Sequence, residues 1–410
     1  MRKKIRRLLC AASALFPITS LIAQPNIAFL SISDIHLNCN QPHPMSIDPC
    51  CQSQRNDMDL KTLKRLLSLI KAETTTTGVI AKPAFILYLG DMVGHKKWQL
   101  TDREAYVKTD ITKIFDLLST YFPNTPIINI FGNNDSVQED YGDYDDTGDS
   151  PSTIAINSHF NNAFLSSGIL CHKTQKQQKM PCLMSQNTHL GCFSIRLADQ
   201  LILIGLNSVM FSRYHHADAN AAAQQIQFLA DALKKAKNEH DSVLIAMHIP
   251  IGNNTYNNKP FWQMAPQKAF LQILLKYRNE IKGLLVAHTH KEEFKVLRLG
   301  DQNIGEYFTA ALSTSHGNSP SVKSFDLVKD QNHWVIGNYT TYQIHDAHGK
   351  PHLTKYYDFN ALYCHAEGKI HDINLCLKSV SFKDILARLN VNNPNNQPYA
   401  RFPETFYVAP

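Results

Sequence analysis

Five apolar runs of this sequence each end in one or two side chains of the types that bind metal ions. The runs have the length and composition of buried strands, and ligands gather at the carboxyl ends of strands in α/β sheets. Any one of these side chains alone is an ordinary loop residue. Five consecutive strand ends carrying such residues form a pattern that chance seldom produces. The candidate metal ligands are Asp34, His36, Asp91, Asn133, His248, His288 and His290.

The elements that must position these residues alternate between apolar runs and amphipathic stretches. The predicted strands are 27–32, 84–89, 127–131, 201–206, 243–247 and 284–287. The predicted helices, which show the apolar spacing of one helical face, are 60–71, 111–121, 221–237 and 268–278. Such alternation predicts an α/β sandwich in which the strands carry the candidate ligands.

Beyond His290 the pattern changes from alternating helices and strands to strands alone. Four more apolar runs follow, at 294–299, 307–312, 324–328 and 334–342. We expect these four strands to form a second sheet. The remaining residues, 346–410, are predicted to be a small and mainly helical C-terminal appendage, with a helix at 382–389.

The first 23 residues have the layout of a secretory signal. Five basic residues precede an apolar run at 8–16, and small residues lead to Ala23. We therefore expect a signal peptide at 1–23, a catalytic domain at 24–345, and a secreted or periplasmic protein. No later segment approaches the roughly 18 uninterrupted apolar residues that a membrane-spanning helix needs.

The chain that follows the predicted signal is close to electrically neutral. Residues 1–23 contain five of the 41 Lys and Arg residues and no acidic residue, which leaves 36 basic residues against 35 Asp and Glu. This balance gives no electrostatic case for nucleic-acid binding. The sequence does not specify an oligomeric state.

Eight cysteines remain after residue 23, and an even number in an exported chain favours disulfides. They cluster at 39–51, 171–192 and 364–376, so we expect bridges within these regions while the connectivity stays open. Zinc–thiolate sites are the alternative. The sequence lacks the paired Cys-x-x-Cys spacing of such sites, which argues against them.

The residues and their order resemble the calcineurin-like metallophosphoesterases and, within them, the acid sphingomyelinase-like phosphodiesterases. The superfamily resemblance extends from Asp34 to His290, and the closer one covers most of residues 26–345. The closer resemblance rests on Gly90-Asp91-Met-Val-Gly-His95 with Trp98, Leu206-Asn207-Ser208 followed by Ser212-Arg213, Met247-His248-Ile-Pro250, His288-Thr-His290 with Glu293-Phe294, and Ser319-Pro320-Ser321-Val322. The fold that it implies is a two-sheet αββα sandwich of the metallophosphoesterase type.

The resemblance also implies a cofactor of two divalent metal ions. It places one ion on Asp34, His36, Asp91 and His290, and the other on Asp91, Asn133, His248 and His288. Asp91 would bridge the two. Ions roughly 3.5 to 4 Å apart can clamp the attacking and leaving oxygens of a phosphoryl group and activate a water. We expect zinc, and iron or manganese also suit imidazole and carboxylate ligands.

One position departs from the family pattern. Where the family has Gly-Asn-His and then an acidic residue, this sequence has Gly-Asn133-Asn134-Asp135, as some endopolyphosphatase-like members do. An amide donates hydrogen bonds but cannot deliver a proton to a leaving group at neutral pH. We count Asn134 and Asp135 among the catalytic residues. We expect His95, which matches a leaving-group histidine of the sphingomyelinase-like proteins, to be the general acid.

The leading hypothesis is hydrolysis of a phosphodiester, either a phospholipid headgroup or a nucleotide, by metal-activated water outside the cytoplasm. Asn207 in the second motif and Tyr256 in the loop after His248 are the expected substrate-binding residues. One alternative is endopolyphosphatase-like or phosphomonoesterase activity. The other is a binding protein that keeps the metal site but has impaired catalysis because of Asn134.

Overall fold

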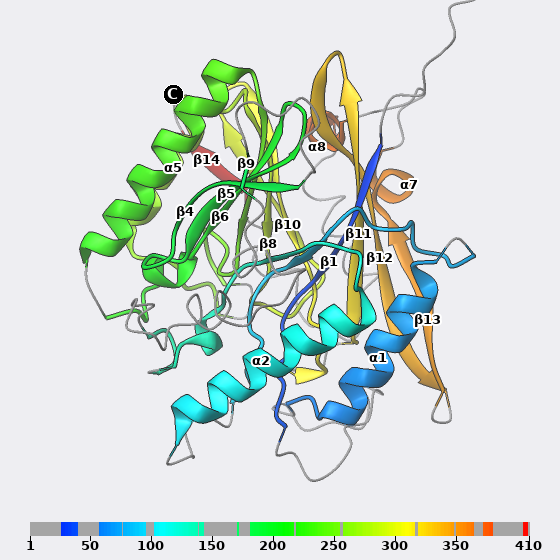
Figure 1. The fold of residues 1–410 in the computed structure, drawn as a ribbon. Helices are drawn as coiled ribbons and strands as arrows, with labels where there is room; N and C mark the ends of the chain where they lie inside the picture. Colours follow the sequence, from blue (N-terminus) through cyan, green and yellow to red (C-terminus); the bar gives the residue numbers. More distant parts are fainter. Residues whose placement is uncertain are drawn as a thin grey trace, which may run out of the picture.

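A computed structural model of the chain shows two β-sheets packed face to face, with helices on their outer sides (Figure 1). It describes residues 26–39, 57–75, 77–95, 102–137, 139–142, 170–171, 181–216, 219–254, 257–315, 319–347, 350–364, 372–379 and 405–408. The predicted signal at 1–23, the predicted helix at 382–389, Trp98 and Tyr256 lie outside these residues. Within them, no helix is long and apolar enough to cross a membrane.

The first sheet has six strands in the order β13-β12-β11-β1-β2-β3. The bounds are β1 Ile27–Ile32, β2 Ile86–Tyr88, β3 Ile127–Asn129, β11 Ser321–Asp330, β12 His333–Ala347 and β13 Lys350–Asp358. Strands β1, β2 and β3 run parallel, and β11 lies antiparallel to β1. The carboxyl ends of β1, β2 and β3 therefore meet at one edge of the sheet.

The second sheet has eight strands in the order β14-β9-β10-β8-β7-β6-β5-β4. The bounds are β4 Cys182–Asn187, β5 Cys192–Ala198, β6 Leu201–Leu206, β7 Ser242–Met247, β8 Ile281–Val286, β9 Phe294–Leu299, β10 Gln302–Phe308 and β14 Thr405–Val408. Strands β6, β7, β8 and β10 run parallel, so their carboxyl ends also share one edge.

Helices complete the outer layers of the sandwich. Helices α1 (Leu60–Glu73) and α2 (Arg103–Tyr121) lie beside the six-stranded sheet, and α5 (Ala219–Glu239) lies along β5, β6 and β7 and packs against α6 (Met264–Lys276). Two short helices, α7 (Phe359–Tyr363) and α8 (Ile373–Ser379), follow β13. This arrangement confirms the predicted two-sheet αββα sandwich.

Local sequence explains why these helices form where they do. The carboxylate of Asp59 caps α1 by accepting a hydrogen bond from the backbone N–H of Thr62 at 3.0 Å. The buried positions of α1 recur at helical spacing and include Leu63, Leu66, Leu67 and Ile70. The helix therefore turns one apolar stripe towards the sheet, which is the main source of its stability.

The strands after His290 do not form a separate second sheet, so that prediction was wrong. Strands β9 and β10 join β8 in the eight-stranded sheet, whereas β11 and β12 join β1 in the six-stranded sheet. Apolar runs indicate where strands occur, but pairing depends on which sheet edges are open once distant segments have packed. The predicted domain boundary after residue 345 falls inside β12, and β13 continues the same sheet.

Disulfides occur within two of the three predicted cysteine clusters. Cys171 pairs with Cys182, and Cys364 pairs with Cys376. Among the other described cysteines, Cys39 and Cys192 are free thiols. Cys50 and Cys51 lie outside the described residues. The bridges tie β4 and α8 to neighbouring loops.

A buried ion pair joins the two sheets near the end of β8. The Nζ atom of Lys323 on β11 donates to Oε1 of Glu292 at 2.6 Å, and both side chains are buried. Tyr357 on β13 also donates to Glu292 Oε1 at 2.7 Å, and the Lys323 ammonium lies 4.2 Å from the ring centroid of Tyr339. Burial raises the pKa of Glu292 and lowers the pKa of Lys323. The charge of each group opposes this effect, because it favours the ionised form of the other. The network ties the segment after His290 to the opposite sheet.

Candidate metal centre

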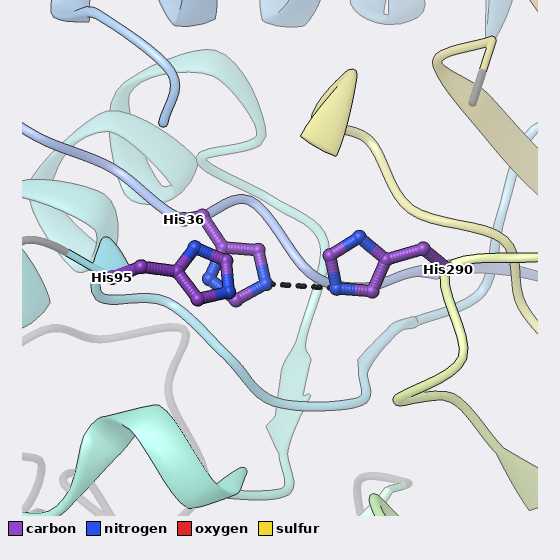
Figure 2. A group of neighbouring side chains, drawn as sticks. All are labelled: His36, His95 and His290. Atoms are coloured by element: carbon purple, nitrogen blue, oxygen red, sulfur yellow. Dashed lines mark hydrogen bonds between the residues drawn. The ribbon is translucent and has the colours of Figure 1, made fainter. Parts of the chain in front are cut away.

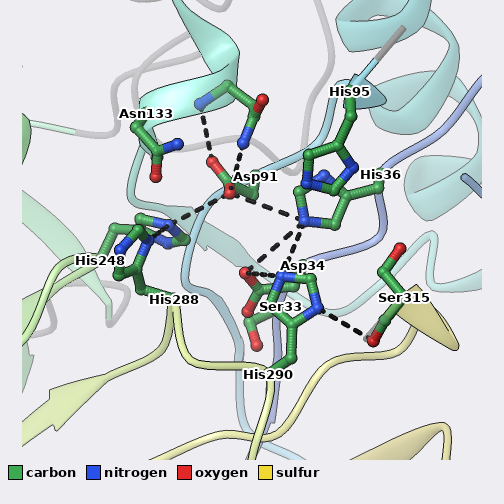
Figure 3. A network of polar contacts seen from close by, with 12 residues as sticks. Ser33, Asp34, His36, Asp91, His95, Asn133, His248, His288, His290 and Ser315 are labelled. Carbon is green, nitrogen blue, oxygen red and sulfur yellow. Dashed lines mark hydrogen bonds and ion pairs between the residues drawn. The ribbon is translucent and has the colours of Figure 1, made fainter. Parts of the chain in front are cut away.

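The seven predicted ligands converge at the edge where the two sheets meet (Figure 3). The six-stranded sheet supplies the residues after β1, β2 and β3, and the eight-stranded sheet supplies those after β7 and β8. The side chains of all the ligands except His288 are buried, and His288 is partly exposed. Strand ends separated by more than 250 positions of chain are thus brought to one place: Asp34, His36, Asp91, Asn133, His248, His288 and His290.

One group of ligand atoms surrounds the space between Asp34, His36, Asp91 and His290, and these atoms all lie within 4.8 Å of one another. His36 Nε2 is 3.1 Å from His290 Nε2 and 3.6 Å from Asp91 Oδ2, and His290 Nε2 is 3.4 Å from Asp34 Oδ1. A tetrahedral ion with bonds of about 2.0 to 2.2 Å would separate its ligand atoms by roughly 3.3 to 3.6 Å. The geometry of this group therefore fits a single ion.

A second group shares Asp91 with the first. Asp91, His248 and His288 also place ligand atoms within 4.8 Å of one another. His248 Nε2 is 3.3 Å from both Asp91 Oδ2 and His288 Nδ1. Asp91 thus stands between two ligand groups, as a bridging carboxylate must.

Unpaired buried oxygens support this interpretation. Three buried oxygen atoms have no hydrogen-bond partner within the described residues. They are the two carboxylate oxygens of Asp34 and the amide oxygen of Asn133. The amide nitrogen of Asn133 donates to Asp140 Oδ1 at 2.8 Å, which orients the amide oxygen. Buried polar atoms without partners are rare in proteins, and a cation at this position would satisfy all three oxygens.

Backbone carbonyl groups orient three of the histidines. The Nδ1 atoms of His36, His248 and His290 contact the carbonyl oxygens of Val93 at 3.1 Å, Leu89 at 2.7 Å and Ser315 at 3.4 Å. A proton on Nδ1 leaves Nε2 as the lone-pair donor, which is the usual arrangement for a metal-binding histidine. In each case Nε2 faces the centre.

The backbone at the ligands is in an unusual conformation. Asp34, His36, Asp91, His288 and His290 all have positive φ angles, between 48° and 75°. Left-handed conformations are uncommon outside glycine, and they tend to occur at functional sites where surrounding structure holds them. Here the loops hold one another, because Asp34 N donates to Gly90 O at 2.9 Å and His36 N donates to Asp91 O at 3.1 Å.

Asp135 holds the loop that carries Asp91. Its carboxylate accepts hydrogen bonds from the backbone N–H groups of Asp91 (3.0 Å), Met92 (2.7 Å), Val93 (3.2 Å) and Gly132 (2.8 Å). A Cβ atom on Gly132 would lie 2.1 Å from Asp91 Oδ1, so only glycine permits this approach. The contacts of Asp135 are those of a positioning residue.

Asn134, at the position that departs from the family pattern, contacts the shared carboxylate. Its backbone N–H donates to Asp91 Oδ1 and its side-chain Nδ2 donates to Asp91 Oδ2, both at 2.9 Å. Two hydrogen bonds fix the orientation of Asp91 and favour its anionic form. Asn134 therefore orients the carboxylate that the two candidate ligand groups share.

The ionisable groups of the centre interact strongly with one another. Burial would raise the pKa of Asp91, but His248, His36 and His288 hold it well below the usual range, whereas burial raises the pKa of Asp34 to about 7. Burial and the charge of His95 lower the pKa of His36 to about 3, which keeps this imidazole neutral. The Asp91 carboxylate outweighs burial at His248 and raises its pKa to about 9. Metal binding would have to displace the proton from His248.

His95 lies against the first ligand group (Figure 2). Its ring stacks on that of His36 with centroids 4.0 Å apart, and its Nδ1 atom contacts Oδ1 of Asp57 at 2.9 Å. Burial would lower the pKa of His95, but the hydrogen bond and the charge of Asp57 raise it. His95 also lies close enough to His36 and His290 for these three histidines to form a metal-binding group.

Asp57 is a further candidate for the site, and the sequence patterns did not single it out. It is fully buried, and it accepts hydrogen bonds from both the backbone N–H and the ring of His95. It lies 38 positions before His95 in a segment without a strand or metal-binding pattern. Only the packing of the loop after β1 reveals this pairing.

Of the two predicted substrate-binding residues, only Asn207 lies within the described residues. Asn207 is buried at the start of a short 3-10 helix, Ser208–Phe211, where its side-chain oxygen accepts from the Val209 N–H at 3.2 Å. Its backbone N–H donates to Oε1 of Gln225 at 2.9 Å. Its Nδ2 atom has no hydrogen-bond partner within the described residues. Tyr256 lies outside those residues.

Comparison with known proteins agrees with this geometry. The sequence model of the calcineurin-like phosphoesterase family matches residues 27–292, which contain all seven candidate ligands. The chain is 26% identical over 315 residues to "Sphingomyelinase phosphodiesterase D" of Dictyostelium discoideum, covering 74% of this chain and 66% of that protein. It is 24% identical over 226 residues to the human "Acid sphingomyelinase-like phosphodiesterase 3b", covering 53% of this chain and 45% of that protein.

These matches span about two thirds of the first relative's length and less than half of the second's. Among solved structures, the dimetal phosphatase LOC 393393 from Danio rerio is similar, with a TM-score of 0.48 and 11% sequence identity. That likeness covers 81% of this chain and 99% of the zebrafish protein. The match to the family model over residues 27–292 confirms the family predicted from the sequence motifs.

Proposed function

Because this chain belongs to the calcineurin-like phosphoesterase family, we propose that it is a dinuclear metal hydrolase that cleaves phosphodiester bonds. The observation that carries the proposal is the pair of ligand groups that share Asp91. A structural zinc site is normally a closed unit of four ligands around one ion. Two groups joined by one carboxylate are instead the arrangement of two-metal hydrolases.

The residues present fit two divalent ions, of which zinc is our first choice. Asp34, His36, Asp91 and His290 would hold one ion, and Asp91, Asn133, His248 and His288 would hold the other. Bound at these positions, the ions would supply Lewis-acid activation of the phosphoryl group and of a water nucleophile. Asn134 and Asp135 would keep the Asp91 carboxylate and its loop in the orientation that both groups need.

His95 is our candidate for the general acid. The Asp57 carboxylate favours the protonated ring, and the ring stands directly against the ligand His36. A protonated imidazole can give its proton to the departing alkoxide, and the amide of Asn134 cannot. The alternative, that His95 is itself a metal ligand, predicts a loss of metal when His95 is replaced.

The substrate that we propose is a phosphodiester, with a phospholipid headgroup or a nucleotide as the two classes. The curated relatives whose names include sphingomyelinase and phosphodiesterase support the diester. Phosphomonoester or polyphosphate hydrolysis is the second candidate, because the Asn133-Asn134-Asp135 sequence is shared with endopolyphosphatase-like proteins. The two disulfides in the described residues support a location outside the cytoplasm.

The test is to replace Asp91 with Ala and to measure metal content and turnover together. Wild-type protein loaded with zinc or manganese should hold about two ions per chain and hydrolyse a chromogenic diester. Asp91→Ala should lose both ions and nearly all activity, because one carboxylate serves both groups.

Asp116→Ala, which removes an exposed carboxylate on α2, is the matched control and should change neither property. If the Asp91 variant keeps two ions and full turnover, the shared centre is wrong. Two tightly bound ions with no turnover of diester, monoester or polyphosphate by wild type would identify a binding protein.

A further inference from the structure

The metal centre reaches the surface beside His288, the one partly exposed residue among the seven ligands. Two aromatic rings stand edge-on to the His288 imidazole, that of Phe261 at 5.5 Å and that of Tyr141 at 6.2 Å between centroids. The ring of Tyr214 packs against Tyr141 at 5.2 Å, and 49% of Tyr214 is exposed. The rings of Tyr141 and Tyr214 therefore form a series, here called the aromatic ladder, that extends from His288 in the second ligand group to solvent.

Tyr141 is held in this ladder by an unusual backbone. Its φ angle is 58°, its N–H donates to the carbonyl of Asn133 at 3.2 Å, and its carbonyl accepts from Nδ1 of His215 at 2.6 Å. The preceding residue, Asp140, binds the amide of Asn133. A tyrosine in a left-handed conformation is unfavourable unless surrounding contacts impose it, and such residues concentrate where a protein binds ligands. The contacts fix Tyr141 relative to a metal ligand.

The exposed ring of Tyr214 is the part of this ladder that a bound ligand would contact. Large aromatic side chains normally bury their rings, yet Tyr214 is 49% exposed where it packs on Tyr141, which in turn contacts His288. The guanidinium carbon of Arg213 lies 5.3 Å from the Tyr214 ring centroid. A quaternary ammonium group bound over the face of Tyr214 would be repelled by the positive charge of Arg213. A neutral planar ring would meet no such repulsion and could stack on the tyrosine.

We propose that Tyr141 and Tyr214 form a stacking subsite that selects phosphoesters carrying a planar heteroaromatic ring, as a nucleobase does, over esters of a quaternary ammonium alcohol. The proposal rests on the proposed function, since it concerns the substrate of the same centre. It assigns Tyr214 as a specificity-determining residue, because its ring contacts the substrate without taking part in phosphoryl transfer. Nothing in the motifs of the sequence pointed to Tyr141 or Tyr214.

The first test measures binding and does not depend on turnover. Metal-loaded wild type and Tyr214→Ala are titrated with adenosine 5′-monophosphate and with inorganic phosphate. Removing a stacked ring should weaken nucleotide binding on the order of tenfold. Binding of inorganic phosphate, which has no ring, should weaken far less. Tyr214→Phe keeps the ring and is the matched control, which should bind the nucleotide as wild type does.

The second test compares two diesters with the same p-nitrophenyl leaving group, one retaining a nucleoside and the other retaining choline. For Tyr214→Ala, the loss of kcat/KM on the nucleoside ester should exceed the loss on the choline ester by about tenfold, and it should appear in KM. Metal content, measured in parallel, should equal that of wild type.

Equal losses on both esters, or a greater loss on the choline ester, would overturn the stacking subsite. So would nucleotide binding that is unchanged in Tyr214→Ala. Failure of the proposed function is a different result, namely that metal-loaded wild type hydrolyses neither ester. In that case the nucleotide titration still decides whether the subsite binds a planar ring.

Discussion

Single residues in this centre are positioned mainly by backbone groups. Carbonyl oxygens of Val93, Leu89 and Ser315 orient three histidines, and the carboxylate of Asp135 gathers four backbone N–H groups around the Asp91 loop. Backbone contacts of this kind make ligand geometry depend on the exact path of loops. Outside the candidate ligands, His95 is the side chain to which we assign a chemical role in the proposal above.

His95→Ala should slow hydrolysis of an ester with a poor alkyl leaving group on the order of a hundredfold to ten-thousandfold. Hydrolysis of a p-nitrophenyl ester should slow much less, since that leaving group departs without protonation. Metal content should be unchanged, because His95 is proposed as an acid. The measurements are kcat on the two esters and elemental analysis of each protein.

His333→Ala is the control for loss of a histidine. His333 is exposed at the start of β12, and β11 runs antiparallel to β1, which places the β11–β12 turn at the end of the sheet away from the centre. Equal slowing of both esters by His95→Ala would mean that His95 positions substrate. Loss of metal would make His95 a ligand, together with His36 and His290.

At the level of elements, each candidate ligand group contains residues from both sheets. The position of one sheet relative to the other therefore sets the distances between the ligand atoms. Asp34 and His36 follow β1, whereas His290 follows β8. Polar contacts join the sheets here: Ser31 Oγ lies 2.7 Å from Thr309 Oγ1, and Lys323 pairs with Glu292. Glu292 is two residues beyond His290, so the ion pair helps to fix the end of β8 against β11.

Lys323→Met should lower the free energy of unfolding by about 3 to 5 kcal/mol, because it leaves Glu292 buried without its cation. The double variant Lys323→Met with Glu292→Gln removes both charges and should recover much of that loss. Denaturant unfolding of the two variants and wild type measures the difference.

Lys113→Met is the control for an ion pair on the surface. Lys113 lies 3.3 Å from Asp116 on α2, and the two side chains are 38% and 51% exposed. Loss of this pair should change the free energy of unfolding by less than about 1 kcal/mol, because both charges stay solvated. A double variant as unstable as Lys323→Met would show that packing, and not the unpaired charge, accounts for the loss.

Across the whole molecule, the sandwich buries apolar side chains from both sheets together with a few costly polar groups. Phe29 stacks on Phe85 and on Phe325 with centroids 4.8 Å apart, which joins β1 to its neighbours. Asp110 on α2 is one such polar group, and burial of its carboxylate lowers stability. Its side chain is buried, and the contacts of its carboxylate with Cys39 and Tyr106 only partly offset the cost of burying the charge. Global stability should therefore depend on its ionisation.

Burial raises the pKa of Asp110 from 3.8 to about 6. The folded state thus disfavours the anion, so the contribution of this group to stability is highest below about pH 4 and falls as the pH rises from 4 to 6. The total loss is about 3 kcal/mol. Asp110→Asn, which cannot ionise, should be more stable relative to wild type at pH 7.5 than at pH 4. Denaturant unfolding at the two pH values measures this change.

Asp116→Asn on the same helix is the control, because its side chain is 51% exposed. Replacement of this surface carboxylate should change stability by less than about 0.5 kcal/mol at either pH. A stability difference between Asp110→Asn and wild type that is the same at pH 4 and pH 7.5 would contradict the prediction.

The sequence alone determined the type of element at most apolar runs, and it identified the candidate metal-binding side chains. The predicted strand at 307–312 is an exception, because β10 ends at Phe308. Strands 27–32, 201–206 and 294–299 were predicted with the bounds that the structure shows, because strand and helix periodicities are local properties. The seven candidate ligands could be found because metal chemistry restricts residue types and strand ends are recognisable. Strands β4, β5 and β13, which carry more polar residues, were missed.

Only the tertiary structure decided which sheet each strand joined and which loops met. It placed β11 beside β1 instead of in a separate sheet, paired Asp57 with His95, and turned Asn134 towards Asp91. It also placed Tyr141 beside His288 and Tyr214 beside Tyr141, although no motif marks either tyrosine. These contacts join residues far apart in the chain, and their geometry depends on the packing of whole sheets and loops, which local residue patterns do not encode.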